Sequence, residues 1–322
     1  MNPYSGADFF QFFGILIQRL FTGQIFSPAA DEVQLAVLCA VSVSCGLIGP
    51  FLVLRRMAMF ANSLSHTILF GIAGAFLVAS KVWTGGLFDL PTLLLGAFIA
   101  ALVTAFLTEG LVRLFRLQED ASVGLVFTAL FALGIVLVTL FTRDVHLGTE
   151  AVMGNVDILQ ISDIRFAALL AAVNLGAVVL FYPSLLLSSF DGGLAKTLGV
   201  KSRRFLLLFL TAITCIGAFR AVGVLLVLAF LTGPYLTARL FCHRLPWLLF
   251  WSCAIGCAAS AAGVALSRHL LSVYGLALST GGIVVSLAGA IFAAALLLKW
   301  ALSGKLSLFG KRQAPCAKES PS

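Results

Sequence analysis

The sequence predicts an all-α membrane protein: a polytopic helical bundle of about nine transmembrane helices, preceded by a short N-terminal amphipathic helix. Hydrophobic residues make up 61% of the 322 residues, whereas charged residues make up only 11%, less than half their usual share in soluble domains. Mean hydropathy is +1.08, and runs such as Ser122 to Phe141 carry no charge. Because each crossing needs about 20 apolar residues, little chain remains for a soluble catalytic domain of ~100 residues.

The elements follow in order along the chain. In the N-terminal segment 1–33, the apolar stretch 9–26 is interrupted by polar residues such as Gln11 and Arg19, which predicts an amphipathic or half-inserted helix, with a tenth crossing as the alternative. A transmembrane domain is predicted over 34–300 and a basic cytoplasmic tail over 301–322. The nine predicted crossings are 35–54, 60–80, 91–112, 122–142, 165–189, 205–219, 221–241, 247–270 and 279–299. They are predicted to be helices, because a spanning segment must satisfy its own backbone and the alternation of barrel strands is absent.

The charged residues predict an orientation. If the first full crossing runs inward and ends at Arg55 and Arg56, the inner side collects 15 of the 21 basic residues, as the positive-inside rule requires. Six basic residues then lie outside, together with eight of the 13 acidic ones. The net charge of +8 therefore reflects orientation in a membrane and is no reason to expect a nucleic-acid partner.

The second predicted crossing carries the densest polar cluster within the apolar segments. Asn62 and His66 are four residues apart and therefore share one helix face, with Ser63 and Thr67 beside them. Imidazole is a common ligand of transition metals, and an amide oxygen is a weaker one. Polar groups at this depth indicate either metal or proton handling or hydrogen bonds between closely packed helices.

Two further features of the sequence are compatible with transport. The predicted outer loop between the fourth and fifth crossings contains Asp144, His146 and Glu150, which would concentrate cations at a pore mouth, although they are equally compatible with a solvated loop. Gly223 and Pro234 flank the apolar run of the seventh crossing. Because proline removes a helix hydrogen bond, this helix is a candidate hinge, or it is simply a static kink.

Five blocks of sequence resemble one family, in the family's order. They are Gly49 to His66 (GPFLVLRRMAMFANSLSH), Glu119 to Gly134, Asp144 to Leu147, Phe190 to Gly199 and Val222 to Pro234. Together they resemble the permease subunits of ABC importers for manganese, zinc and iron, and the resemblance extends from about residue 34 to residue 300.

The resemblance implies a permease domain that forms half of a dimeric pore in the bacterial cytoplasmic (inner) membrane. It implies three kinds of partner: a cytoplasmic ABC ATPase, an extracytoplasmic metal-binding protein and a second permease subunit. No cofactor is expected to stay bound, because the divalent metal ion (manganese, iron or zinc) is the cargo. The family's coupling helix falls near 190–200, where the residues expected to meet the ATPase are Asp191, Leu194, Ala195, Leu198 and Gly199.

One position departs from the family's pattern. Family members usually carry an aspartate four residues before the histidine, and both are thought to bind the ion in transit; here His66 is present but Asn62 replaces the aspartate. A homodimer would then lack this anionic ligand. We therefore favour a heterodimer in which a different permease subunit supplies the carboxylate.

Two other functions fit the sequence less well. An ion-coupled secondary transporter usually places several ionisable residues at mid-membrane, whereas His66 stands nearly alone in these segments. An intramembrane enzyme is disfavoured because the chain has no His-Glu-x-x-His sequence. The phosphate-binding sequence Gly-x-x-x-x-Gly-Lys-[Ser/Thr] is also absent, so a non-enzymatic subunit driven by a separate ATPase is expected.

Overall fold

The computed structural model of the protein describes residues 3–4, 6, 8–22, 29–82, 90–141, 154–190, 197 and 204–310. In these residues it contains ten α-helices, one short 3₁₀ helix and no strand, which confirms the predicted fold class. The elements are α1 (Phe9–Phe21), α2 (Ala30–Leu54), α3 (Ala58–Val82), α4 (Leu90–Leu114), α5 (Glu119–Phe141), η2 (Val156–Ile158), α6 (Ile161–Phe190), α8 (Arg204–Val222), α9 (Val224–Phe241), α10 (Leu245–Tyr274) and α11 (Thr280–Gly310).

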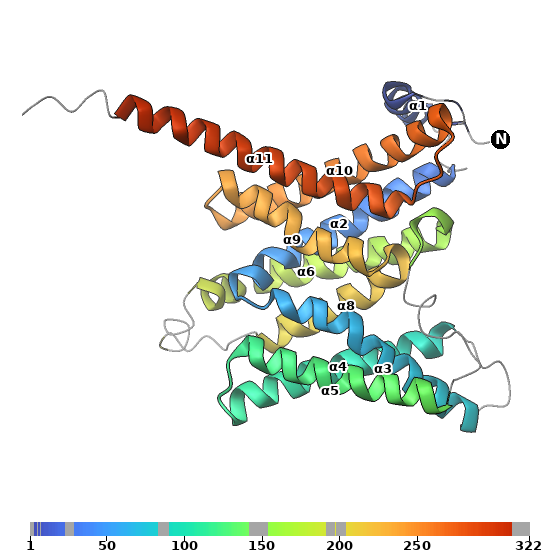
Figure 1. The fold of residues 1–322 in the computed structure, drawn as a ribbon, viewed down its shortest axis with the longest axis vertical. Coiled ribbons are helices and arrows are strands. Elements are labelled where there is room, and N and C mark those ends of the chain that lie inside the picture. The colour runs from blue at the N-terminus through green and yellow to red at the C-terminus, as the bar shows by residue number, and fades with distance from the viewer. Residues whose placement is uncertain are drawn as a thin grey trace, which may run out of the picture.

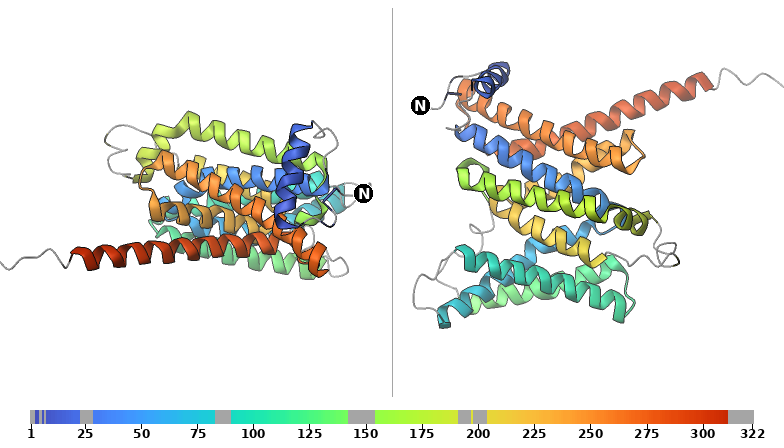
Figure 2. Two further views of the ribbon diagram at one scale, coloured as in Figure 1. Left: turned by 90° about the horizontal axis from the view of Figure 1, so that it is seen from above. Right: turned by 180° about the vertical axis from the view of Figure 1, so that it is seen from behind.

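Nine of the described helices, α2 to α11, are long and apolar enough to cross a membrane, as the hydropathy pattern predicts. The remaining helix, α1, has 13 residues and is therefore about 20 Å long, too short for a hydrocarbon core of about 30 Å. It runs roughly perpendicular to the spans beside the end of α10 (Figure 2, left). This placement agrees with a helix lying at the membrane surface rather than a tenth crossing.

The spans form two groups joined through α8 (Figure 1). Helices α3, α4 and α5 pack against one another at one side, and α2 packs against α6, α8, α9 and α10 in the other group, with α11 against α9 and α10. Helix α8 contacts members of both groups, including α2, α3, α4 and α6. Because α2 is surrounded by partners, it forms the centre of the bundle.

Small residues set the closest helix crossing in the α3 group. A Cβ atom added at Gly71 of α3 would collide with the carbonyl oxygen of Gly96 in α4, and one added at Gly96 would collide with the carbonyl oxygen of Gly71. Such mutual backbone approach is the reason small residues are favoured between membrane helices. Gly71 therefore has a packing role between α3 and α4.

A polar cluster lies within the α2 group. The side-chain amide of Asn174 in α6 donates to Oγ of Ser44 in α2 over 2.6 Å and to Oγ1 of Thr214 in α8 over 2.7 Å. All three residues are fully buried. Three helices are thus tied together within the bundle by one side chain that the sequence analysis did not single out.

Most helix ends differ from the predicted limits by a few residues, and two differences change the interpretation. The break between the sixth and seventh spans falls at Gly223, so Arg220 lies in the last turn of α8 rather than between the helices. At the other end of the chain, α11 continues to Gly310, beyond the predicted start of the tail at residue 301. Figure 1 shows this last helix projecting past the ends of its neighbours.

Candidate functional site

The α3 face that carries Asn62 and His66 is open in the single chain. Both side chains are exposed, and neither forms a side-chain hydrogen bond within the described part of the chain. The neighbouring hydroxyls point inward instead: Ser63 and Thr67 are 3% and 0% exposed. They donate to the carbonyl oxygens of Phe60 and Leu64 on their own helix. The structure therefore separates two polar groups that are free to interact from two that are already satisfied.

Two aromatic rings of α5 flank His66. The imidazole centroid lies 5.2 Å from the ring of Phe127 and 5.4 Å from the ring of Phe131, and these two phenyl rings stack 5.8 Å apart. Because phenylalanine offers neither a polar donor nor a polar acceptor, the two rings engage neither imidazole nitrogen, and the unprotonated nitrogen keeps its capacity to bind an ion or a proton. The rings restrict the imidazole on one side and leave its exposed side free.

A complete metal site does not occur within the described residues of one chain. No group of three or more histidine, cysteine, aspartate or glutamate side chains there could hold a metal ion. On α3 the donors are one imidazole and one amide oxygen, which are too few for the four to six ligands of a transition metal. Further ligands for an ion at His66 would have to come from water, from the remainder of the chain or from another subunit.

Gly223, a predicted hinge residue, lies at the closely packed connection between α8 and α9. Gly223 has a φ of 86°, a conformation that costs glycine little. Gly154, which precedes η2, lies against it, and a Cβ atom at Gly154 would collide with backbone atoms of Phe219, Arg220 and Gly223. Pro234 lies buried inside α9. The structure thus explains why glycine occupies position 223, and movement of Gly223 or Pro234 during transport stays a prediction.

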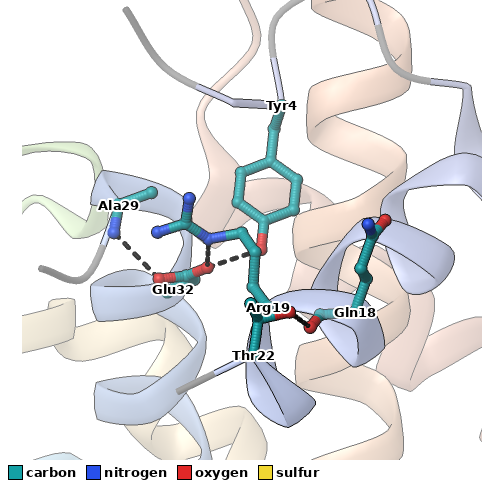
Figure 3. Close-up of polar contacts among 6 residues, drawn as sticks. All are labelled: Tyr4, Gln18, Arg19, Thr22, Ala29 and Glu32. Carbon is teal, nitrogen blue, oxygen red and sulfur yellow. Dashed lines mark hydrogen bonds and ion pairs between the residues drawn. The ribbon is translucent and has the colours of Figure 1, made fainter. Parts of the chain in front are cut away.

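The predicted outer ends of the helices carry a polar cluster centred on Glu32 (Figure 3). Oε1 of Glu32 accepts from the hydroxyl of Tyr4 over 2.7 Å and from Nε of Arg19 over 2.6 Å. Its Oε2 accepts from the N–H of Ala29 over 2.9 Å, which caps the start of α2. Burial, with the Glu32 carboxylate adding to it, raises the pKa of Tyr4 above its ordinary value, so the phenol remains a donor. One carboxylate therefore holds α1 on α2.

Ion pairs extend this cluster over the same side of the molecule. Asp31 pairs with Arg268 of α10 over 3.1 Å, and Asp163 pairs with Arg220 over 3.8 Å. With Arg19, three of the six basic residues predicted to lie outside thus meet carboxylates predicted to lie outside. The sequence could not reveal these pairs, because the partners are far apart along the chain.

At the predicted inner side, Glu109 and Arg113 of α4 form an ion pair, with Nε of Arg113 2.5 Å from Oε1 of Glu109. Two other sets of predicted site residues lie outside the described residues. They are Asp144, His146 and Glu150 of the predicted outer mouth, and Asp191, Leu194, Ala195, Leu198 and Gly199 of the predicted coupling segment.

Known proteins similar to this chain share one kind of description. The model of the ABC 3 transport family matches residues 31–299. The chain is 39% identical over 291 residues to a Chlamydia muridarum protein named "Probable metal transport system membrane protein", covering 89% of this chain and 91% of that one. It is 35% identical to the Bacillus subtilis manganese transport system membrane protein MntD, over 80% of this chain and 88% of that protein.

The fold also has a solved counterpart. A chain in the structure of PsaBC from Streptococcus pneumoniae in complex with Fab superposes with a TM-score of 0.66. The match covers 85% of this chain and 94% of the other, at 24% identity. At that identity the likeness supports the arrangement of helices.

Proposed function

Because this chain belongs to the ABC 3 transport family, we propose that it is the permease subunit of an importer for divalent transition-metal ions: manganese, iron or zinc. It is a multi-pass protein of the bacterial cytoplasmic membrane and a translocation subunit, and the ATP is hydrolysed by a separate chain. The proposed cargo is supported by relatives described as metal transport and manganese transport proteins.

The observation that carries the proposal is the exposed pair on α3. Asn62 and His66 lie on one face of a spanning helix, and neither side chain has a hydrogen-bond partner in the described residues. Polar side chains directed into lipid are costly, so this face is expected to meet a second subunit and water. We place the ion path along it, with the His66 imidazole as a transient ligand and the Asn62 amide oxygen as a weaker one.

The partner subunit is proposed to complete the ligand set. Since α3 supplies no carboxylate, a different permease subunit with an aspartate on the matching helix would add the missing anionic oxygen. The extracytoplasmic binding protein would deliver the ion to the mouth formed by Asp144, His146 and Glu150. The ATPase would act on the segment that contains Asp191, Leu194, Ala195, Leu198 and Gly199.

Uptake by the assembled importer tests the proposal. Vesicles that contain the permease, its ATPase and the binding protein are supplied in turn with manganese, iron or zinc, with and without ATP. Replacing His66 by alanine should lower uptake at least about tenfold, the scale on which metal sites respond to loss of even a supporting group. The matched control is His243→Ala, because His243 is an exposed histidine in the connection between α9 and α10 and is not part of α3.

Two results would contradict the proposal. Uptake that persists without ATP or the ATPase would favour the secondary-transporter alternative. Unchanged uptake by the His66→Ala protein would remove this imidazole from the ion path.

A further inference from the structure

Arg55 connects the inner end of α2 to the inner end of α6. Its Nε donates a hydrogen bond to Oγ of Ser189 over 3.2 Å, and its Nη2 donates to Oγ of Ser188. Ser188 itself donates to the carbonyl oxygen of Ser184 over 2.5 Å, so its hydroxyl is oriented to accept from the guanidinium. A planar guanidinium that donates through two nitrogens fixes direction as well as distance, which an ammonium group does not.

The chain turns from α2 into α3 directly after Arg55. The N–H of Arg56 bonds to the carbonyl oxygen of Val53 over 3.0 Å, and the N–H of Met57 bonds to that of Leu52 over 2.9 Å. Arg56 has a φ of 60°, and Met57 is 2% exposed. This is the Schellman pattern of helix termination, closed by a buried apolar residue. The corner therefore leaves little freedom between the Arg55 backbone and the first turn of α3.

The open pair on α3 lies close to this corner. Helix α3 begins at Ala58, so Asn62 and His66 fall within about its first three turns. The side chain of an arginine at a helix end can extend into water, but that of Arg55 is half-buried and turned toward α6. The contact to α6 and the α3 face that carries His66 are thus joined by one short, well-bonded stretch of chain.

We propose that Arg55 is a positioning residue that transmits movement of the inner end of α6 to the helix that carries His66. The inference rests on the proposed function, in which the ATPase acts on the segment that follows α6. Displacement of Ser188 and Ser189 moves the guanidinium, the guanidinium moves the corner, and the corner tilts the base of α3. ATP hydrolysis is thereby linked to the orientation of the Asn62–His66 face.

The test measures manganese ions transported per ATP hydrolysed by the assembled importer in vesicles. Arg55→Gln should lower this ratio about tenfold, the scale of losing hydrogen bonds to a charged group, while ATP hydrolysis continues. Arg55→Lys should give a ratio between those of the wild type and Arg55→Gln, because lysine keeps the charge but loses the forked geometry of the guanidinium. Arg56→Gln is the matched control: Arg56 is the next residue, at the same corner, and exposed, so its ratio should equal that of the wild type.

A second variant tests the contact from the other side. Ser188→Ala combined with Ser189→Ala removes both acceptors without changing the charge, and should lower the ratio as Arg55→Gln does. Combining all three changes should add nothing further, because residues that act through one contact are not additive. If Arg55→Gln fails to accumulate in the membrane, the serine variant alone decides the outcome.

The failures are distinguishable. Wild-type vesicles that take up no metal would overturn the proposed function and the inference with it. Wild-type uptake together with an unchanged ratio in the serine variant, or with additive effects of the arginine and serine changes, would overturn only the role of Arg55.

Discussion

Two asparagines within spanning helices have opposite surroundings. Asn174 is fully buried between α2, α6 and α8, and both hydrogens of its amide are donated to hydroxyl groups. Asn62 is exposed on α3, and no hydrogen bond engages its side chain in the described residues. Asparagine therefore bonds neighbouring helices to one another in one region, and in the other its side chain is accessible to a partner outside the chain.

The difference indicates that polar groups in membrane helices have two distinct roles. A polar side chain that forms hydrogen bonds to neighbouring helices contributes to assembly, whereas one without such bonds on an open face marks a path for ions or a partner. Asn174 should accordingly affect stability, and Asn62 with His66 should affect transport. The following three experiments separate these effects.

The largest effect is expected from Asn174→Leu. Losing two hydrogen bonds between membrane helices should cost about 1–3 kcal/mol, and Ser44 would lose its Asn174 donor. The purified protein should unfold at a lower temperature in detergent, by a thermal-shift measurement. Asn62→Leu is the control and should leave this midpoint unchanged. Equal destabilisation by the two substitutions would contradict a structural role for Asn174 that Asn62 does not share.

A smaller effect is expected from Phe127→Leu. Removing one ring beside His66 loses an aromatic contact worth about 1 kcal/mol, which corresponds to roughly a fivefold change in an equilibrium. The imidazole would be less restrained, so the half-saturating manganese concentration for uptake should rise by up to this factor. The control is Phe250→Leu, which replaces an exposed ring of α10 and should leave the half-saturating concentration unchanged. An equal rise in both variants would contradict a role for Phe127 in positioning His66.

The smallest effect is expected from Asn62→Asp. If a second subunit already supplies the carboxylate, the new aspartate should change uptake within about threefold, or roughly 0.6 kcal/mol. Uptake of radioactive manganese and the subunit composition of the purified complex are measured together. Abolished uptake, or a functional complex that contains two copies of this chain alone, would contradict the heterodimer.

The spans could be predicted because hydropathy is a local property. Long uncharged runs predict helices such as α5 wherever they occur in the chain, and the nine spans were confirmed. The break at Gly223 was less predictable, because its place depends on the close contact with Gly154. Asn174 offered a signal, an amide within the apolar run of α6, yet no local feature identifies Ser44 and Thr214 as its partners.

The candidate site was predictable only in part. Spacing placed Asn62 and His66 on one face, since residues four apart coincide on a helix. It also grouped them with Ser63 and Thr67, whose hydroxyls the structure turns inward. The contact of Arg55 with Ser188 and Ser189 spans more than 130 positions along the chain, so no sequence pattern could reveal it.

The sequence by itself determined the membrane class, the number of spans and the sharing of one helix face by Asn62 and His66, because each follows from local composition and helical periodicity. Only the tertiary structure decided which polar groups are satisfied. The amide hydrogens of Asn174 are donated to neighbouring helices, Glu32 holds α1 on α2, and His66 remains open beside two rings of α5. The physical reason is that a hydrogen bond depends on which helices are neighbours, and neighbourhood is set by packing of the whole bundle.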